Sequence, residues 1–376
     1  MIRIDILTVK GTIVHIAVDT RMIRSSGIGT FLRNVLQRIV SARPDWNFFL
    51  LGNSVELHEI DALQKKNVTM IDCRAPIYSI REQLELPLKV PSNIEVFWSP
   101  HFNVPIFYNG TIVSTIHDMA HLAVPGIADT MPKKLYAKFM YRMAVKKSAR
   151  ITCVSKFTMR EVEKYTGAQE NRLRLIYNAA DASWFQIKAG KRIYERPYFI
   201  YVGNIKPHKN LRRLIVAYKE AAADLREDLI LVGKKDGFIG GEDGIEDLLQ
   251  GFEERIHFTG YVSDADLQQY IVQSEGLVLL SLYEGFGLPP LEAMAAGRKA
   301  LVSDIPVFHE VYGDCVMYCD PYDVQTIAKS LRTFAKTSFD KRRLQEKAAA
   351  YSWERTAQKS IEILEEVGKT RGACIT

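Results

Sequence analysis

Residues 280–297 read Leu-Ser-Leu-Tyr-Glu-Gly-Phe-Gly-Leu-Pro-Pro-Leu-Glu-Ala-Met-Ala-Ala-Gly. An apolar run that ends at Leu280 predicts a buried strand, and the two prolines predict a helix that opens directly after a glycine loop. Gly285 and Gly287 permit close approach of the backbone to a ligand, and the free N–H groups at a helix start attract an anion. Strand, glycine loop and helix in this order are typical of the ligand-binding edge of a parallel sheet.

Two glutamates in this segment define the chemistry that it could carry. Glu284 and Glu292 are eight residues apart. Carboxylates accept hydrogen bonds, so such a pair can hold two hydroxyl groups of a sugar or a ribose. A capped helix that carries solvated glutamates would account for the same residues equally well.

Short apolar runs alternate with amphipathic segments along the rest of the chain, which indicates parallel sheets covered by helices on both faces. A charged stretch at 178–197 interrupts this pattern and has the composition of a linker. We therefore predict two doubly wound α/β domains, residues 1–180 and 181–352, with the ligand site between them. The expected strands are 12–18, 48–51, 68–71, 96–98, 112–115, 151–154, 198–202, 229–232, 256–258, 276–280 and 300–302. The expected helices are 28–40, 131–148, 157–165, 210–222, 264–273 and 290–296, with three more from about residues 324, 341 and 353.

The composition is that of an ordinary globular protein, with 376 residues, 47% apolar and 25% charged. No apolar stretch approaches the ~20 residues that span a bilayer. Residues 1–10 are too short and too interrupted for a signal peptide. The five cysteines fit no disulfide framework. We therefore expect a cytoplasmic protein.

Positive charge is concentrated in the first half of the chain. Lys and Arg exceed Asp and Glu by nine in residues 1–180, whereas the acids exceed by three in residues 181–376. Between 133 and 150, which contain no acid, basic residues recur at every fourth position beside an apolar row. The basic residues are Lys134, Lys138, Arg142, Lys146 and Arg150, with Lys133 and Lys147 beside them, and the apolar row is Leu135, Phe139 and Met143.

Two interpretations of this basic segment remain open. Like charges at this spacing oppose helix formation, so an anionic membrane against 133–150 would explain them. Alternatively, the charges form a solvated face above a row that packs into the core. Nucleic acid is not expected, because no nucleic-acid-binding motif accompanies the charge.

A second loop follows the predicted strand 198–202. Gly203 turns the chain, and Lys206 and Lys209 precede a helix that begins near Asn210. Cations at the carboxyl end of a strand suit a pyrophosphate. An exposed basic turn would have the same composition.

Two further loops follow strands of the first domain. Gly27 and Gly29 precede a helix and could approach a phosphate, but the full G-x-G-x-x-G pattern is missing, so a plain tight turn is the alternative. His117 follows strand 112–115 and could hydrogen-bond a ligand hydroxyl, or it could serve a structural role with Asp118 orienting it.

These segments together closely resemble the family 4 retaining glycosyltransferases of the GT-B fold, and among them the bacterial mannosyltransferase-like branch. The resemblance covers almost the whole chain in order, and the Glu-x7-Glu segment is its most specific part. It comprises Asp19-Thr-Arg21 with the Gly27–Gly29 loop, Thr115-Ile-His-Asp118, Val154-Ser-Lys-Phe157, Asn178-Ala-Ala-Asp181, Val202-Gly-Asn-Ile-Lys-Pro-His-Lys-Asn210, Glu284 to Glu292, Asp320-Pro-Tyr-Asp323 and Tyr-Ser-Trp353.

The resemblance implies two facing Rossmann-like domains with a deep cleft between them. The N-terminal domain would bind the acceptor and the C-terminal domain the nucleotide-sugar donor. Residues 353–376 would form a crossover helix that returns to the first domain.

The resemblance also assigns roles to individual residues. Glu284 would bind donor-sugar hydroxyls, Glu292 the ribose and Lys209 the pyrophosphate, with His117 beside the sugar. Donor contacts would also come from Gly27, Gly29 and Gly203, and from the backbone N–H groups of Phe286, Gly287 and Leu288. Asn204 stands where many relatives have an arginine, and Lys206 could compensate for the missing charge.

The implied reaction transfers a hexose, in the first place mannose from GDP-mannose, to a saccharide or a lipid-linked saccharide in surface polysaccharide biosynthesis. The family retains the anomeric configuration by front-face attack. No Asp-x-Asp motif stands out as a metal clamp, so we expect metal-independent activity without a cofactor. The protein would lie in the cytoplasm, with a peripheral contact to the inner face of the membrane.

Other functions on the same residues also stay open. The donor could be a UDP-sugar or another nucleoside-diphosphate sugar. The chain could instead be an epimerase, a phosphorylase, or a catalytically silent subunit that recruits a partner to a membrane. A nicotinamide dehydrogenase is disfavoured by the incomplete glycine pattern.

Overall fold

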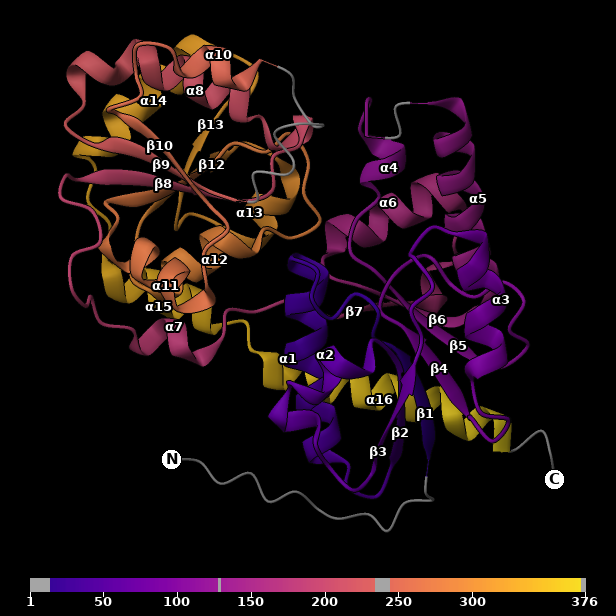
Figure 1. Cartoon of the computed structure of the whole chain (residues 1–376). Coiled ribbons are helices and arrows are strands. Elements are labelled where there is room, and N and C mark those ends of the chain that lie inside the picture. Colours follow the sequence, from indigo (N-terminus) through magenta and orange to yellow (C-terminus); the bar gives the residue numbers. More distant parts are fainter. Residues whose placement is uncertain (1–13, 128–129, 234–243, 373–376) are drawn as a thin grey trace.

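The computed structural model describes residues 14–127, 130–233 and 244–372. It contains two parallel sheets, one in each half of the chain (Figure 1). The first has the strand order β3-β2-β1-β4-β5-β6-β7, and the second the order β10-β9-β8-β11-β12-β13. In both sheets the order reverses beside the first strand, which is the doubly wound arrangement. The predicted fold class, two Rossmann-like α/β units in series, is confirmed.

The first sheet carries the strand ends that matter for the site. Its helices lie on both faces, as expected for strands that are buried on both sides. The strands are β1 (His15–Asp19), β2 (Asn47–Gly52), β3 (Val68–Asp72), β4 (Val96–Ser99), β5 (Ile112–Ile116), β6 (Ser148–Cys153) and β7 (Leu173–Leu175). The helices are α1 (Gly27–Ala42), α2 (Ser54–His58), α3 (Ile80–Lys89), α4 (Ala120–Ala123), α5 (Met131–Lys147) and α6 (Lys156–Thr166).

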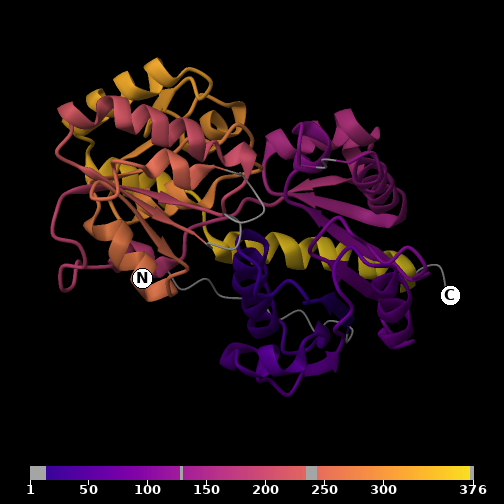
Figure 2. The ribbon, with the colours of Figure 1, turned by 45° about the horizontal axis from the view of Figure 1, so that its top comes forward.

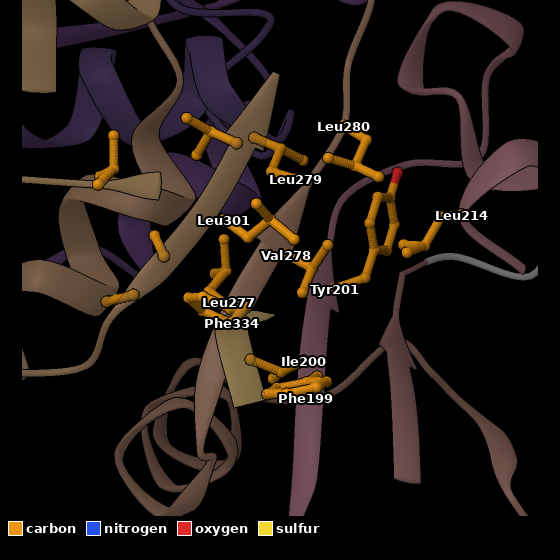
Figure 3. Packing of buried hydrophobic residues seen from close by; sticks show 14 of the residues in the cluster. Phe199, Ile200, Tyr201, Leu214, Leu277, Val278, Leu279, Leu280, Leu301 and Phe334 are labelled. Atoms are coloured by element: carbon orange, nitrogen blue, oxygen red, sulfur yellow. The ribbon is translucent and has the colours of Figure 1, made fainter. Parts of the chain in front are cut away.

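The second sheet is built in the same way. Its strands are β8 (Tyr198–Val202), β9 (Asp228–Val232), β10 (Ile256–Gly260), β11 (Gly276–Leu279), β12 (Ala300–Ser303) and β13 (Met317–Cys319). The helices are α7 (Ala182–Gln186), α8 (Leu211–Ala221), α10 (Ile245–Leu249), α11 (Asp264–Gln273), α12 (Leu288–Ala295), α13 (Pro306–Tyr312), α14 (Val324–Lys336) and α15 (Lys341–Ala349). Figure 3 shows its core, in which Phe199 and Ile200 of β8 lie beside Leu277 and Val278 of β11.

The last helix, α16 (Trp353–Gly372), leaves the second domain and runs across the first (Figures 1 and 2). It packs on α1 in a shared apolar cluster that includes Phe31, Trp353, Ile361 and Leu364. Trp353 is fully buried there. The helix therefore joins the two halves of the chain through a hydrophobic contact. None of the described helices is long and apolar enough to cross a membrane.

Several predicted boundaries shift by a few residues. The predicted strand 12–18 begins partly outside the described residues and is observed as β1 (His15–Asp19). Helix α12 begins at Leu288 rather than at residue 290, because Gly287 adopts a left-handed φ of 88° just before it. The predictions did not include the strands β7 and β13 or the helices α2, α3, α4, α7, α10 and α13. Proline lies inside α3 and at the start of α13. The domain boundaries at residues 180 and 352 stay predictions.

Candidate functional site

Lys209 and Glu284 form a direct ion pair, although they lie 75 residues apart in the chain. Lys209 Nζ is 2.5 Å from Glu284 Oε1, and the Ser281 hydroxyl donates to the same oxygen at 2.8 Å. The loops that carry them are tied together, because the backbone N–H of Leu282 donates to the carbonyl of His208 at 2.7 Å. Both loops follow neighbouring strands, β8 and β11. The edge predicted to bind a ligand therefore carries a fixed cation and a fixed carboxylate.

The glycine loop between Glu284 and α12 has no room for side chains. A Cβ on Gly285 would lie 1.9 Å from the His117 carbonyl oxygen of the first domain. A Cβ on Gly287 would lie 2.5 Å from the Tyr312 hydroxyl. Gly285 therefore lets the two domains touch, and Gly287 lets the chain enter α12.

The start of α12 has few backbone N–H groups, because its second and third residues are prolines. The first N–H groups of a helix have no intrahelical acceptor. Pro289 and Pro290 have no N–H, so Gly287 and Leu288 supply the free N–H groups at this helix end, with Phe286 one residue before the cap. That these three residues bind a ligand stays a prediction. The positive end of the helix dipole adds to their attraction for an anion.

Glu292 lies half-buried on α12, one turn inside the helix. Loss of hydration raises the pKa of its carboxyl to about 7, with smaller contributions from the negative charges of Asp264 and Asp181. A carboxyl with this pKa is partly protonated at neutral pH. It can therefore donate one hydrogen bond as well as accept others, a property that suits neighbouring hydroxyl groups.

His117 follows β5 and is neutral. Burial lowers its pKa, outweighing the opposing effects of the Pro100 carbonyl and Asp118. Nε2 lies 3.0 Å from the Pro100 carbonyl oxygen, which can only accept, so the proton sits on Nε2 and Nδ1 is left as an acceptor. The ring stands edge-on to Phe31 of α1 at 5.1 Å between centroids.

The two glycines of the first loop differ in their surroundings. Gly27 opens α1 and faces space with no atom within 4 Å of a hypothetical Cβ. A Cβ on Gly29 would lie 2.7 Å from the Ile23 carbonyl oxygen, so the tight turn accounts for this glycine. Of these two glycines, only Gly27 lies where a ligand could approach the backbone.

The loop after β8 reaches the first domain. The Asn204 side chain donates to the Ser26 hydroxyl at 3.2 Å, beside Gly27. Lys206 is exposed, and its charge lowers the pKa of His121 in α4, after the larger effect of burial. Gly203 approaches the neighbouring loop so closely that a Cβ on Gly233 would lie 2.1 Å from its carbonyl oxygen.

Hydrogen bonds hold the glycine loop against the first domain. The Ser155 hydroxyl donates to the Gly285 carbonyl at 2.7 Å, and the backbone N–H of Met119 donates to the Tyr283 hydroxyl at 3.2 Å. Beside this contact, a groove of about 380 Å³ is lined by both domains. Val124 and Pro125 line it from the first domain, and the second domain contributes residues of the β8 and β11 loops together with Arg212 and Arg213 of α8.

The basic segment is only partly the stripe that we predicted. Lys134, Lys138, Arg142 and Lys146 are exposed on α5. Arg150 is not on this helix: it lies in β6 and pairs with Glu366 of α16, so its inclusion was wrong. Lys147 is half-buried and donates to the Tyr108 carbonyl at 2.6 Å.

The apolar residues beside this stripe point to solvent. Leu135 is 59% and Phe139 50% exposed, whereas the core-facing residues of α5 are Ala137, Met140, Tyr141 and Ala144. The interpretation of a core-packed apolar row is therefore wrong for Leu135 and Phe139. The helix presents a mixed basic and apolar surface.

A buried polar network in the first domain was missed by the sequence analysis. The Arg21 guanidinium pairs with Asp19 at 2.7 Å and with Glu82 at 3.0 Å, and Asn103 donates to Glu82. Arg21 and Glu82 have almost no exposed side-chain area. Asp19 and Arg21 belong to the motifs quoted from the sequence, whereas no sequence pattern marked Glu82 and Asn103 as their partners.

One Asp-x-Asp triplet was also overlooked, at Asp264-Ala-Asp266. In the structure it opens α11 as part of a helix cap. The Ser263 hydroxyl accepts from the backbone N–H of Asp266 at 3.1 Å and donates to its carboxylate at 2.7 Å. The Ser263 side chain thus caps α11, and Asp266 bonds to the capping hydroxyl, so the triplet has a structural role.

Comparisons with protein families match both halves of the chain. Residues 183–353 match the family model described as glycosyl transferases group 1. Residues 93–184 match the model described as glycosyltransferase family 4.

Several curated relatives are mannosyltransferases. The chain is 30% identical over 256 residues to O-antigen chain mannosyltransferase RfbU of Salmonella typhimurium, covering 68% of this chain and 69% of that protein. It is 35% identical over 176 residues to O-antigen chain mannosyltransferase B of Escherichia coli, covering 44% of each. It is 31% identical over 233 residues to a serotype-specific mannosyltransferase WbdA of Escherichia coli, covering 56% of this chain and 28% of WbdA. The chain thus spans less than half the length of both Escherichia coli relatives.

Solved structures share the fold at low identity. Alr3699/HepE of Anabaena in complex with UDP and glucose superposes with a TM-score of 0.71 at 16% identity, over 94% of this chain and 100% of that chain. WaaG, a glycosyltransferase involved in lipopolysaccharide biosynthesis, superposes with a TM-score of 0.68 at 15% identity, over 93% and 99%.

Proposed function

Because this chain belongs to the family 4 glycosyltransferases of the GT-B fold, we propose that it transfers mannose from GDP-mannose to a saccharide in surface polysaccharide biosynthesis. The family membership confirms the resemblance drawn from the sequence motifs. The relatives named as O-antigen mannosyltransferases support the sugar and the pathway class. A saccharide carried on a lipid is included among the acceptors.

The observation that carries the proposal is the Lys209–Glu284 pair at the edge of the second sheet, beside the start of α12. Breaking the bond between the anomeric carbon and the phosphate places negative charge on the diphosphate and positive charge on the sugar. The Lys209 ammonium and the backbone N–H groups of residues 286–288 would stabilise the diphosphate. Such fixed groups act most strongly where water is excluded.

Glu284 would hold hydroxyl groups of the donor sugar. Its Oε1 already accepts from Lys209 and Ser281, so the orientation of the carboxylate is set before a ligand arrives. The carboxylate therefore loses no further conformational entropy when the substrate reacts. Glu292, with its raised pKa, would bind the ribose.

We propose that the reaction retains the anomeric configuration by front-face attack. The acceptor oxygen forms the new glycosidic bond as the bond to the phosphate breaks, and the acceptor proton passes to the departing diphosphate oxygen. In this scheme neither glutamate acts as the nucleophile that a retaining glycosidase would need. Metal independence and the absence of a cofactor are part of the same proposal.

The proposed location is the cytoplasm, with α5 against the inner face of the membrane. The exposed row of Leu135 and Phe139 beside four exposed basic residues supports this contact. Apolar residues inserted at the lipid interface and cations facing anionic head groups are the two elements of such binding.

The test is a donor panel with product analysis. Purified protein is incubated with GDP-mannose, UDP-glucose, UDP-galactose and ADP-glucose, with methyl α-mannoside as acceptor and with or without EDTA. We expect GDP release and a new α-mannosidic linkage by NMR only with GDP-mannose, unchanged by EDTA. A β-linked product would exclude retention of the anomeric configuration. Preference for a UDP-sugar would exclude GDP-mannose as the donor, and inhibition by EDTA would exclude metal-independent activity.

A further inference from the structure

Four aromatic side chains from separate elements meet beside the candidate site. Tyr78 lies between β3 and α3, and its ring centroid is 5.5 Å from His101, 6.2 Å from His121 and 6.4 Å from Tyr136. We call these four residues the Tyr78 surface. Tyr78 is 45% exposed. The surface is therefore assembled and still accessible.

The backbone holds Tyr78 in a conformation that tyrosine rarely adopts. Its φ is 65°, in the left-handed region where a bulky side chain is strained. The next residue, Ser79, begins α3 and bonds to both Glu82 and Pro76. The Tyr78 hydroxyl is tied to His101 Nε2 at 3.1 Å. Backbone strain of this kind is concentrated at functional sites, and the contacts of the ring with its aromatic neighbours hold it in place.

The Arg21 cation near this surface is already paired, whereas the Asp118 carboxylate acts on Tyr78 and His121. Arg21 is bound by Asp19 and Glu82, and all three side chains are buried. Burial lowers the pKa of both His101 and His121, so both imidazoles are neutral. The first domain therefore offers a ligand here aromatic faces and neutral hydrogen-bonding groups rather than a cation.

One polar atom of the surface has no partner. Nδ1 of His121 is buried and makes no hydrogen bond within the described part of the chain. A buried group of this kind destabilises the free protein, and a ligand hydroxyl would satisfy it. Side chains at binding sites commonly change rotamer when a ligand binds, and such a change would bring His121 Nδ1 within hydrogen-bonding distance of the ligand hydroxyl.

The surface adjoins the site proposed for the donor. His121 follows Asp118 and His117 in the same strand-end segment, and Lys206 of the second domain acts electrostatically on it. The backbone N–H of Met119, between Asp118 and His121, donates to Tyr283 next to Glu284. A group bound at Tyr78 would thus lie on the first-domain side of the reacting sugar.

We propose that the Tyr78 surface binds a neutral pyranose of the acceptor, with the sugar ring stacked on Tyr78 and a hydroxyl bonded to His121. The C–H bonds on one face of a pyranose carry partial positive charge, which suits the negative face of an aromatic ring. This inference rests on the proposed function, and it implies that the enzyme extends an uncharged glycan end rather than a phosphorylated one.

The experiment compares Tyr78→Phe, Tyr78→Gly and His121→Ala, with the exposed Phe107→Ala of the same domain as a matched control. Glycine accepts a φ of 65° without strain, so Tyr78→Gly should fold. The KM for methyl α-mannoside should rise about tenfold or more in Tyr78→Gly, and change less than about threefold in Tyr78→Phe and Phe107→Ala. The dissociation constant of GDP should not change in any variant.

A binding measurement separates this inference from the proposed function. Saturation-transfer NMR on the wild type with GDP should show methyl α-mannoside in contact with aromatic protons, and Tyr78→Gly should lose the signal. Binding lost in Tyr78→Gly would support the surface even if no donor were turned over. An unchanged KM and an unchanged NMR signal in Tyr78→Gly would overturn it, as would tighter binding of mannose 6-phosphate than of methyl α-mannoside.

Discussion

Glu310 of α13 accepts a hydrogen bond of 2.7 Å from the backbone N–H of Lys156, the first residue of α6. Its second carboxylate oxygen accepts from Phe157 at 2.9 Å. A side chain of the second domain therefore caps a helix of the first, where unpaired N–H groups and the helix dipole favour a negative charge. This contact and the Ser155–Gly285 hydrogen bond both join the two domains.

Glu310→Ala should loosen the domains and lower stability by about 0.5–2 kcal/mol, the usual effect of losing a helix cap. Glu310→Gln keeps one acceptor oxygen and should lose less. Urea unfolding measures stability, and small-angle scattering measures the radius of gyration, which we expect to increase. The exposed Glu195→Ala is the matched control. Equal stability and an unchanged radius in Glu310→Ala would show that the cap does not hold the domains together.

Lys209→Ala should reduce kcat by about 10²–10³-fold, because it removes a fixed charge aimed at the departing diphosphate. The change corresponds to about 2.7–4 kcal/mol of transition-state stabilisation. Lys209→Arg should recover part of the rate, since it keeps the charge at a different geometry. Exposed Lys191→Ala serves as the control. Near-normal turnover by Lys209→Ala would remove Lys209 from the reaction.

The variants Gly27→Ala and Gly29→Ala should have different effects, the first on donor binding and the second on stability. Gly29→Ala places a methyl group 2.7 Å from the Ile23 carbonyl and should lower stability by about 1–3 kcal/mol. Gly27→Ala meets open space and should keep the wild-type melting temperature while weakening GDP-mannose binding. Isothermal titration and thermal unfolding measure the two effects. Unchanged donor affinity in Gly27→Ala would assign the whole loop to turn formation.

Glu292 should make the protein less stable as the pH rises. Its pKa is raised to about 7, above the value of 4.5 that it has without the fold, so folding favours the protonated form. The associated stability is fully present below pH 4.5 and is lost as the pH rises through 7. Glu292→Gln should therefore match the wild type at pH 4 and exceed it by on the order of 1–3 kcal/mol at pH 8. Parallel urea titrations at both pH values decide this, and an equal difference at pH 4 and pH 8 would exclude the titration of Glu292 as its cause.

The exposed surface of α5 should bind anionic vesicles. Flotation with vesicles that contain phosphatidylglycerol should recover the wild type but not Lys134→Glu/Lys138→Glu, because each basic residue near an anionic surface strengthens binding. Leu135→Ser/Phe139→Ser should also lose binding, because the apolar row inserts at the interface. Lys188→Glu/Lys191→Glu is the charge-matched control, with both lysines exposed on the second domain. Equal flotation of all variants would place the membrane contact elsewhere or exclude it.

The sequence determined the alternation of strands and helices, because strands buried on both faces are apolar throughout and differ plainly from amphipathic helices. It also determined the loop from Leu280 to Gly297, where Gly285, Gly287 and the two prolines can be identified without coordinates. What it could not show was why Gly285 is glycine, since the atom that excludes a Cβ belongs to His117 in the other domain.

The tertiary structure alone decided which side chains meet. The ion pair between Lys209 and Glu284 joins two loops 75 residues apart, and the strand order that brings them together is a property of the whole sheet. The Tyr78 surface draws on four separate elements, and the short helix α3 beside it has too little periodicity to be predicted. The sequence could place Leu135 and Phe139 in one row of a helix, but only the packing of α5 showed that this row faces solvent, because burial depends on what the rest of the chain places against it.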